Sequence, residues 1–428
     1  MSEFSTFIVN LKKVFFYLKR HASWVLLGRF YLMIIGVLIS VILTRMMTKS
    51  EYGEYQYFLV VLSIFSFISL PNATNVLIRY YGKGYAWSYM GLFFLRLKFS
   101  LLAVFLFLGM AIYAFLANDI YTALVFLIFS ICFPLFYSCD LFEYLLQSEM
   151  NFKKLNIYYI IRSSARFLVV ILTYWIMGNI LFSIIGYILT TTLVNSWLFY
   201  KTKSDYAIKY KNINKMVHKK MNTMAVNLSL IGVFSLVSSQ IDKILIAEFI
   251  SIEALANYSI GMLIGMSINT IFKSVISIFD VKFVKNKIGL IYYLFLFFLG
   301  SIVGWALTYL VSHVIVILYG DAYSSSIIYA SIILSSMGIY LVAILSENHF
   351  LLYFDKNEKI AYSSSIFISL VVLLLISTII MYPLEDEIKL ILFALIYPVK
   401  LILVVFTHLF FEKWYCKKLS VNSTRALI

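Results

Sequence analysis

Four basic residues lie inside stretches of this chain that are otherwise apolar, and these are the residues best placed to do chemistry. They are Arg29, Arg162, Arg166 and Lys400. If the stretches cross a membrane, each charge at a helix centre costs roughly 2.5–3.5 kcal/mol, or about 10 kcal/mol for the set. Each side chain must therefore face a partner or water, and a cation in water inside a membrane attracts anions.

The spacing of these cations divides them into two groups. Arg162 and Arg166 are four residues apart and share a helix face. Arg162 lies at a depth similar to that of Asp140 and Glu143 on the preceding stretch, which predicts an ion pair with one of them. Arg29, Arg166 and Lys400 have no carboxylate at matching depth. For these three the sequence predicts a water-filled cavity that attracts anions, with snorkelling to the interface as the alternative.

Acidic residues gather instead at the predicted outer ends of the apolar stretches. Of the charged residues there, the candidates for gating or coupling are Arg45, Glu51, Asp242 and Glu248. No carboxylate occupies the middle of an apolar stretch, although proton or cation coupling usually needs one. The expected cavity is therefore cationic and would repel a cationic ligand.

Composition identifies the medium that holds these elements. The 428 residues are 62% hydrophobic and 13% charged, whereas soluble domains are about 45–50% apolar and about 25% charged. The net charge of +15 could indicate nucleic acid, but basic loops between apolar spans are expected of membrane proteins. We therefore predict an integral membrane protein with no nucleic-acid partner.

Stretches of about 20 apolar residues, the length of a membrane span, occur twelve times. They are Ala22–Leu43, Tyr52–Leu70, Leu97–Ala117, Tyr121–Cys139, Ile157–Met177, Ile180–Tyr200, Met224–Gln240, Ala254–Val275, Ile288–Leu310, Ser326–Leu345, Ile360–Tyr382 and Ile388–Phe411. The longest polar stretch, 201–222, falls after the sixth. The predicted fold is all-α, with twelve transmembrane helices in two parallel six-helix lobes.

The predicted lobes have defined bounds. Residues 1–200 form the N-terminal lobe, which adds a short interfacial helix before its six spans; residues 201–222 form a basic cytoplasmic linker; residues 223–428 form the C-terminal lobe with a basic tail. With the N-terminus inside, the cytoplasmic segments hold 27 Lys and Arg residues and the opposite side holds four. This asymmetry predicts that both termini are cytoplasmic.

A short motif repeats between the two halves. The polar turn after the first span carries Glu51 and Tyr55, and about 200 residues later Glu253 and Tyr258 follow a second apolar stretch. A period of this length indicates two similar halves.

Several smaller signals concern helix packing and cofactors. Gly261-x-x-x-Gly265 and Gly300-x-x-x-Gly304 predict close helix contacts, and Pro134 and Pro398 predict a kink or a freed carbonyl. The three cysteines have neither disulfide nor metal-site spacing, so no cofactor is expected.

The turn Arg45-x-x-x-x-x-Glu51-Tyr52-Gly53-x-Tyr55, with its echo in the second half and Trp24-x-x-x-x-Arg29 in the first span, resembles a known family. It is similar to the polysaccharide repeat-unit flippases (Wzx type) of O-antigen and capsule synthesis, in the MATE-like MOP exporter superfamily. The resemblance implies a multi-pass protein of the bacterial inner membrane, with two lobes around a cavity that opens alternately to each side.

The cargo implied by this resemblance is an undecaprenyl-diphosphate-linked oligosaccharide repeat unit, moved from the cytoplasmic to the outer leaflet. Its anionic head group would bind Arg29 and Lys400 first, with Arg166 second and Arg162 as a further candidate. Implied partners are this lipid-linked oligosaccharide, membrane lipids, and a polysaccharide polymerase with its chain-length regulator.

Two rival functions remain at this point. An integral-membrane polysaccharide polymerase or glycosyltransferase would need a catalytic residue on a sizeable external loop, and the predicted loops are short, so no enzyme activity is expected. A MATE-type multidrug exporter is the other alternative.

Overall fold

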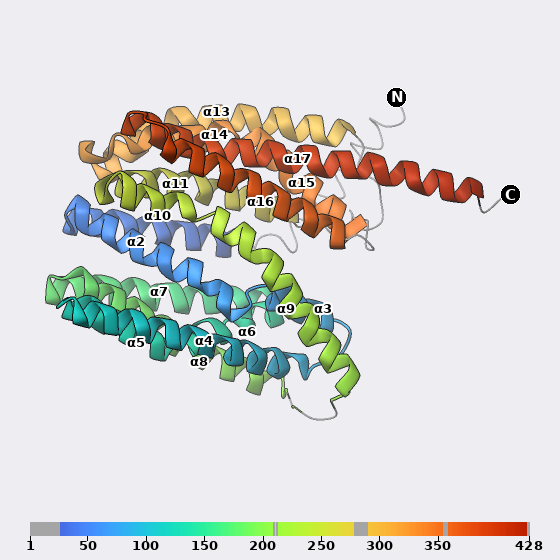
Figure 1. Cartoon of the computed structure of the whole chain (residues 1–428), viewed down its shortest axis with the longest axis horizontal. Coiled ribbons are helices and arrows are strands. Elements are labelled where there is room, and N and C mark those ends of the chain that lie inside the picture. Colours follow the sequence, from blue (N-terminus) through green and yellow to red (C-terminus); the bar gives the residue numbers. More distant parts are fainter. Residues whose placement is uncertain (1–25, 209, 211–212, 278–289, 354–357, 426–428) are drawn as a thin grey trace. The chain divides into compact units, whose positions relative to one another are not determined.

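The computed structural model describes residues 26–208, 210, 213–277, 290–353 and 358–425. Throughout these residues the regular structure is helical (Figure 1). The interfacial helix expected before the first span lies outside the described residues.

The chain divides into two compact units. One unit holds Ile34–Ile244, and the other holds the chain up to Met33 together with Leu245 and all that follows. The sequence placed the division between the lobes at 201–222 instead. Helix α8 continues to Asp205 and α9 begins at Lys215, so much of that predicted linker is helical.

Within Ile34–Ile244 the helices follow one another with short connections. After a helix at Leu26–Met46 come α2 (Lys49–Phe65), η1 (Ser66–Ser69), α3 (Ala73–Tyr81), α4 (Ser88–Leu116), α5 (Ile120–Ser138), α6 (Leu141–Ser148), α7 (Phe152–Met177), α8 (Ile180–Asp205), α9 (Lys215–Ser238) and α10 (Ile241–Phe249). Side-chain caps fix several starts. Asn151 accepts from the Lys154 N–H at 3.2 Å, for example, and thereby pairs one of the free amides at the start of α7.

The second unit repeats this pattern. Its helices are α11 (Ile252–Ser277), α13 (Leu290–Tyr319), η2 (Asp321–Tyr323), α14 (Ser326–Ser335), α15 (Met337–Tyr353), α16 (Glu358–Met381) and α17 (Asp386–Arg425). Helices α2, α4, α7 and α8 begin at residues 49, 88, 152 and 180, and α11, α13, α16 and α17 begin at 252, 290, 358 and 386, offsets of 203, 202, 206 and 206. The faint repeat in the sequence is therefore a repeat of the architecture.

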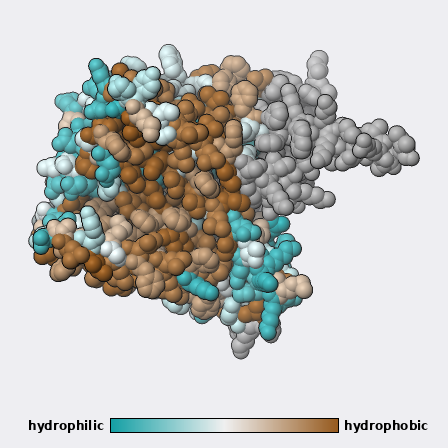
Figure 2. Space-filling view, in the orientation of Figure 1, coloured by the Kyte–Doolittle hydropathy of each residue, from teal (hydrophilic) through white to brown (hydrophobic). Residues whose placement is uncertain are grey.

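Among the described residues, ten helices are long and apolar enough to cross a membrane, and the number rises to as many as twelve if each of two bent helix pairs counts as one span. The bent pairs are Lys49–Ser69 with Ala73–Tyr81, at 49°, and Ser326–Ser335 with Met337–Glu347, at 50°. On the face shown in Figure 2, hydrophobic residues cover most of the central surface. The exposed residues are largely apolar, as expected when lipid is the solvent.

The glycine motifs bring helices into close contact. A Cβ on Gly261 would lie 2.7 Å from the Ser326 carbonyl oxygen, and one on Gly304 would lie 2.2 Å from the Leu334 carbonyl oxygen. Both distances are shorter than any normal contact, so only glycine fits there. The close helix contacts predicted for these motifs are confirmed, and the structure shows that α14 is a partner of both α11 and α13.

The prolines behave differently. Helices α5 and α17 continue through Pro134 and Pro398. The strong bend in the first unit occurs at Pro71, where Leu70 adopts a left-handed conformation with φ of 55°. Such a conformation is uncommon for a branched residue and marks a local break in the helix.

Candidate functional site

One face of α7 carries a row of polar and charged side chains. Lys154, Tyr158, Arg162 and Arg166 follow one another at four-residue spacing, so they project on the same side, about 6 Å apart along the axis. Helix α7 packs against α6 and α8, and these two helices supply the partners of the row.

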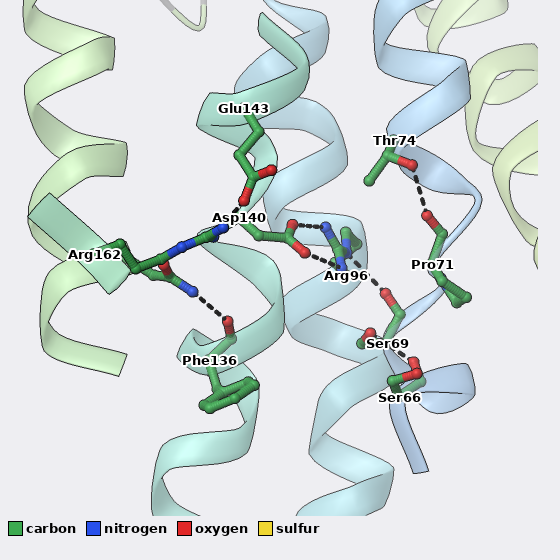
Figure 3. Close-up of polar contacts among 10 residues, drawn as sticks. Ser66, Ser69, Pro71, Thr74, Arg96, Phe136, Asp140, Glu143 and Arg162 are labelled. Carbon is green, nitrogen blue, oxygen red and sulfur yellow. Dashed lines mark hydrogen bonds and ion pairs between the residues drawn. The ribbon is translucent and has the colours of Figure 1, made fainter. Parts of the chain in front are cut away.

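One ion pair in this row joins Arg162 to Glu143 at the start of α6 (Figure 3). The Tyr159 hydroxyl donates to the second oxygen of the same carboxylate at 2.9 Å. Both charged side chains are about 15% exposed. The ion pair predicted for Arg162 is therefore confirmed, and because its charge is balanced, Arg162 is a weaker candidate for binding an anion than Arg166.

A second buried pair joins Arg96 of α4 to Asp140, the residue that precedes α6 (Figure 3). The apolar stretch predicted for this helix begins at Leu97, so the sequence places Arg96 just outside the predicted span. Helix α4 begins at Ser88, nine residues before the apolar stretch that predicted it, so Arg96 lies two turns inside the helix and only 1% of it is exposed.

Arg96 is held there by a broken helix. In a continuous α-helix the Ser69 carbonyl would accept from the Ala73 N–H, but that N–H donates to Leu70 instead, at 3.0 Å. The Arg96 Nε–H donates to the freed Ser69 oxygen at 2.9 Å. Arg96 thus joins the break between α2 and α3 to the break between α5 and α6, and its buried charge is paired with Asp140.

Arg166 lies one turn beyond Arg162 in a different environment. Its guanidinium carbon is 5.3 Å from the centre of the Tyr187 ring of α8, and one of its terminal nitrogens donates to the Tyr187 hydroxyl at 3.3 Å. Its Nε atom is buried without a hydrogen-bond partner. No described carboxylate lies within 4.0 Å of it. A ring face and a hydroxyl orient this cation and leave its charge unbalanced locally.

The other two expected cations are both partly buried. Arg29 lies on the helix Leu26–Met46, and Lys400 lies on α17 one turn beyond Tyr397. The sequence analysis assigned them to opposite lobes, whereas the compact units place both in the one that contains Leu245 onward. Tyr397 in turn accepts from the Asn269 side chain at 3.1 Å, which adds a polar group near Lys400 on α17.

Glu51 has a structural role at the start of α2. Thr48 and Glu51 form a capping box, in which the Thr48 N–H donates to the carboxylate at 2.8 Å and the Glu51 N–H donates to the Thr48 hydroxyl at 3.3 Å. The Tyr174 hydroxyl at the far end of α7 donates to the same carboxylate at 3.3 Å. A capping role accounts for a carboxylate at this position without any coupling function.

The remaining outer-end candidates fall into two places. Arg45 is exposed in the last turn of its helix. Asp242 is buried and Glu248 exposed, and both lie on α10. Among the described residues no cluster of three or more His, Cys, Asp or Glu side chains could hold a metal ion. The gating or coupling role of Arg45, Asp242 and Glu248 stays a prediction.

A family match covers most of the chain. Residues 18–279 match the polysaccharide biosynthesis protein family. The chain belongs to this family. No curated protein sequence is similar enough to count as a relative of this family member.

Solved structures with the same fold are transporters. A MATE structure in the bent conformation has a TM-score of 0.62 at 12% identity, over 96% of this chain and 97% of that one. A mutant of the Vibrio cholerae MATE transporter VcmN has a TM-score of 0.60 at 12% identity, with 96% and 98% covered. The lipid II flippase MurJ in its inward closed conformation has 0.57 at 15%, with 90% and 87% covered. This family member therefore has the MATE-like fold that the sequence predicted.

Proposed function

We propose that this chain is a flippase that moves an undecaprenyl-diphosphate-linked oligosaccharide from the cytoplasmic to the outer leaflet of a bacterial inner membrane. Membership of the polysaccharide biosynthesis protein family supports a carbohydrate cargo, and the shared fold with a lipid II flippase supports a lipid-linked one. The polyprenyl tail can stay in the bilayer, so the protein needs to shield only the charged and sugar-bearing head group.

The observation that carries this proposal is Arg166. A cation on a membrane-spanning helix, oriented by Tyr187 and without a carboxylate among the described residues within 4.0 Å, is suited to attract a diphosphate. Arg29 and Lys400 are the further residues that we propose to contact the head group. Arg162 would contribute only if the substrate displaced Glu143 from it.

The test compares Arg166→Gln with Arg166→Lys in proteoliposomes. The cargo is a fluorescent undecaprenyl-diphosphate oligosaccharide, and flipping is measured as the rate at which its label becomes accessible to a quencher in the outer leaflet. A charge-assisted hydrogen bond contributes about 1.5–3 kcal/mol. The glutamine variant should therefore flip roughly 10- to 100-fold more slowly, and lysine should restore part of the rate.

The matched control is Lys98→Gln, which neutralises an exposed cation on α4 of the same unit and should leave the rate unchanged. If Arg166→Gln flips at the rate of the unmodified protein, Arg166 does not bind the diphosphate. If the unmodified protein does not flip this cargo at all, the proposed function is wrong.

Solved structures with this fold include a multidrug-resistance MATE transporter, so drug export is a second candidate function, with cationic drugs as the cargo to test. An unbalanced guanidinium repels such cargo, which favours the anionic lipid. Protection of cells from cationic dyes by this chain, with no effect on lipid-linked oligosaccharide, would reverse that preference.

We further propose that the membrane potential drives transport. With the basic segments on the cytoplasmic side, an anion that moves outward descends an inside-negative potential, which gains about 2.3 kcal/mol per charge per 100 mV. Flipping should therefore accelerate when a potassium gradient with valinomycin makes the donor side negative. Equal acceleration by a pH gradient at zero potential would refute this.

A further inference from the structure

Helix α9 belongs to one half of the chain by sequence and to the other by contact. It opens the second repeat, because it lies ahead of α11 as the helix Leu26–Met46 lies ahead of α2. In space it belongs to the unit Ile34–Ile244, where it contacts α3, η1 and α4. Figure 1 shows α9 passing beside α3.

A side-chain hydrogen bond joins α9 to the break in the second span. The Asn72 side-chain amide, between η1 and α3, donates to the Leu228 carbonyl in the middle of α9 at 2.8 Å. Gly232, one turn further along α9, makes room for this contact. A Cβ on Gly232 would lie 2.3 Å from the Asn72 Nδ2 atom.

The chemistry of this contact makes it specific and easy to release. It requires an amide donor on one side and a glycine on the other, yet it contains no ion pair. The carbonyl of Leu228 has a helical partner available, so the loss of Asn72 leaves it satisfied. In contrast, Arg96 and Asp140 are an ion pair inside the unit, and separating them would expose a buried charge to an apolar environment.

We propose that the contact between Asn72 and Gly232 is a latch between the second and seventh spans that must open once in each transport cycle. This inference rests on the proposed function, since only a transporter that alternates between two states needs such a contact to be transient. The latch lies where one helix is already broken: the Ser69 carbonyl accepts from Arg96 and not from the Ala73 N–H, and the helix bends by 49° there. A break of this kind is where α3 can change its angle.

The test is a reversible crosslink at this position. The variant Asn72→Cys, Gly232→Cys is made in a background in which Cys132, Cys139 and Cys416 are replaced by alanine. A Cβ on Gly232 lies 3.5 Å from the Asn72 Cγ atom, so the two thiols are within reach of a disulfide. Oxidation should lower the flipping rate at least tenfold, and reduction should restore it.

The matched control crosslinks two helices that should move together. The Ser183 hydroxyl donates to the Val170 carbonyl at 3.2 Å between α8 and α7, and Val170→Cys, Ser183→Cys should flip equally fast when oxidised and when reduced. If the Asn72–Gly232 disulfide forms and the oxidised protein flips the cargo as fast as the protein with free thiols, transport does not require the latch to open. If only the control pair crosslinks, the two positions are not adjacent and the inference also fails.

A second measurement is independent of the cargo. Spin labels on Asn75 of α3 and Lys219 of α9, both exposed, report the separation of the two helices. The latch predicts two distance populations in the reduced protein, one of which disappears on oxidation, and Gly232→Ala should favour the longer distance. One unchanged distance in the reduced protein, the oxidised protein and the Gly232→Ala variant would overturn the latch, even if the protein flips the proposed cargo.

Discussion

The buried pair of Arg96 and Asp140 allows a quantitative prediction. Arg96 is 1% exposed and Asp140 about one quarter exposed, so removal of either partner leaves the other poorly solvated. Breaking a buried ion pair in this way costs about 3–5 kcal/mol. Arg96→Met also leaves the Ser69 carbonyl without its donor, which adds about 1–3 kcal/mol.

The double variant Arg96→Met, Asp140→Leu should be less damaging than either single variant. It removes both charges, and the loss that remains is the unpaired Ser69 carbonyl, about 1–3 kcal/mol. The losses of unfolding free energy in the two single variants should therefore sum to about 7–13 kcal/mol. The double variant should lose far less, which corresponds to a coupling free energy of at least about 4 kcal/mol.

Equilibrium unfolding of the purified protein in mixed micelles gives these free energies. A double variant as unstable as the sum of the two single variants would show that the two side chains do not interact. Arg162→Met serves as a comparison, because it breaks a different, partly buried pair in the same unit. Arg162 interacts with Asp140 without an ion-pair contact, so its coupling to Asp140→Leu should be smaller than that of Arg96→Met.

The other predictions concern the helix contacts and the start of α2. Gly304→Ala should destabilise the protein by about 1–3 kcal/mol, because its Cβ would overlap the Leu334 carbonyl. Gly36→Ala should be neutral or slightly stabilising, because no atom lies within 4 Å of the added Cβ. Thermal unfolding in detergent compares the two variants, and equal losses of stability would refute the packing argument. Thr48→Ala should cost about 1 kcal/mol by removing the cap shared with Glu51, and an unchanged midpoint would show that the capping box does not stabilise α2.

Much of the fold follows from the sequence because the solvent imposes it. Stretches of apolar residues long enough to cross a bilayer must be helical, since each backbone group needs a partner within its own segment. All twelve predicted spans correspond to helices or bent helix pairs. The small residues at Gly261 and Gly304 likewise indicated close contacts, because few other reasons keep glycine at four-residue spacing in an apolar helix.

Only part of the candidate site could be predicted from the sequence. Depth alone predicted that Arg162 pairs with Asp140 or Glu143, because charges at the same level of adjacent spans have few other partners, and the structure shows that the partner is Glu143. Arg96 was missed because α4 extends nine residues beyond its apolar core. Nothing in the order of residues indicates that a helix break at Leu70 frees a carbonyl for Arg96 to satisfy.

What the sequence by itself determined was the helical type of the spans, their approximate positions and the presence of charges within them, because those depend on transfer of side chains and backbone from water to lipid. What only the tertiary structure decided was which charges are balanced. Arg162 and Arg96 have carboxylate partners, whereas Arg166 has the face of Tyr187. That distinction depends on a few ångströms between side chains of different helices, and no periodicity along one helix records it.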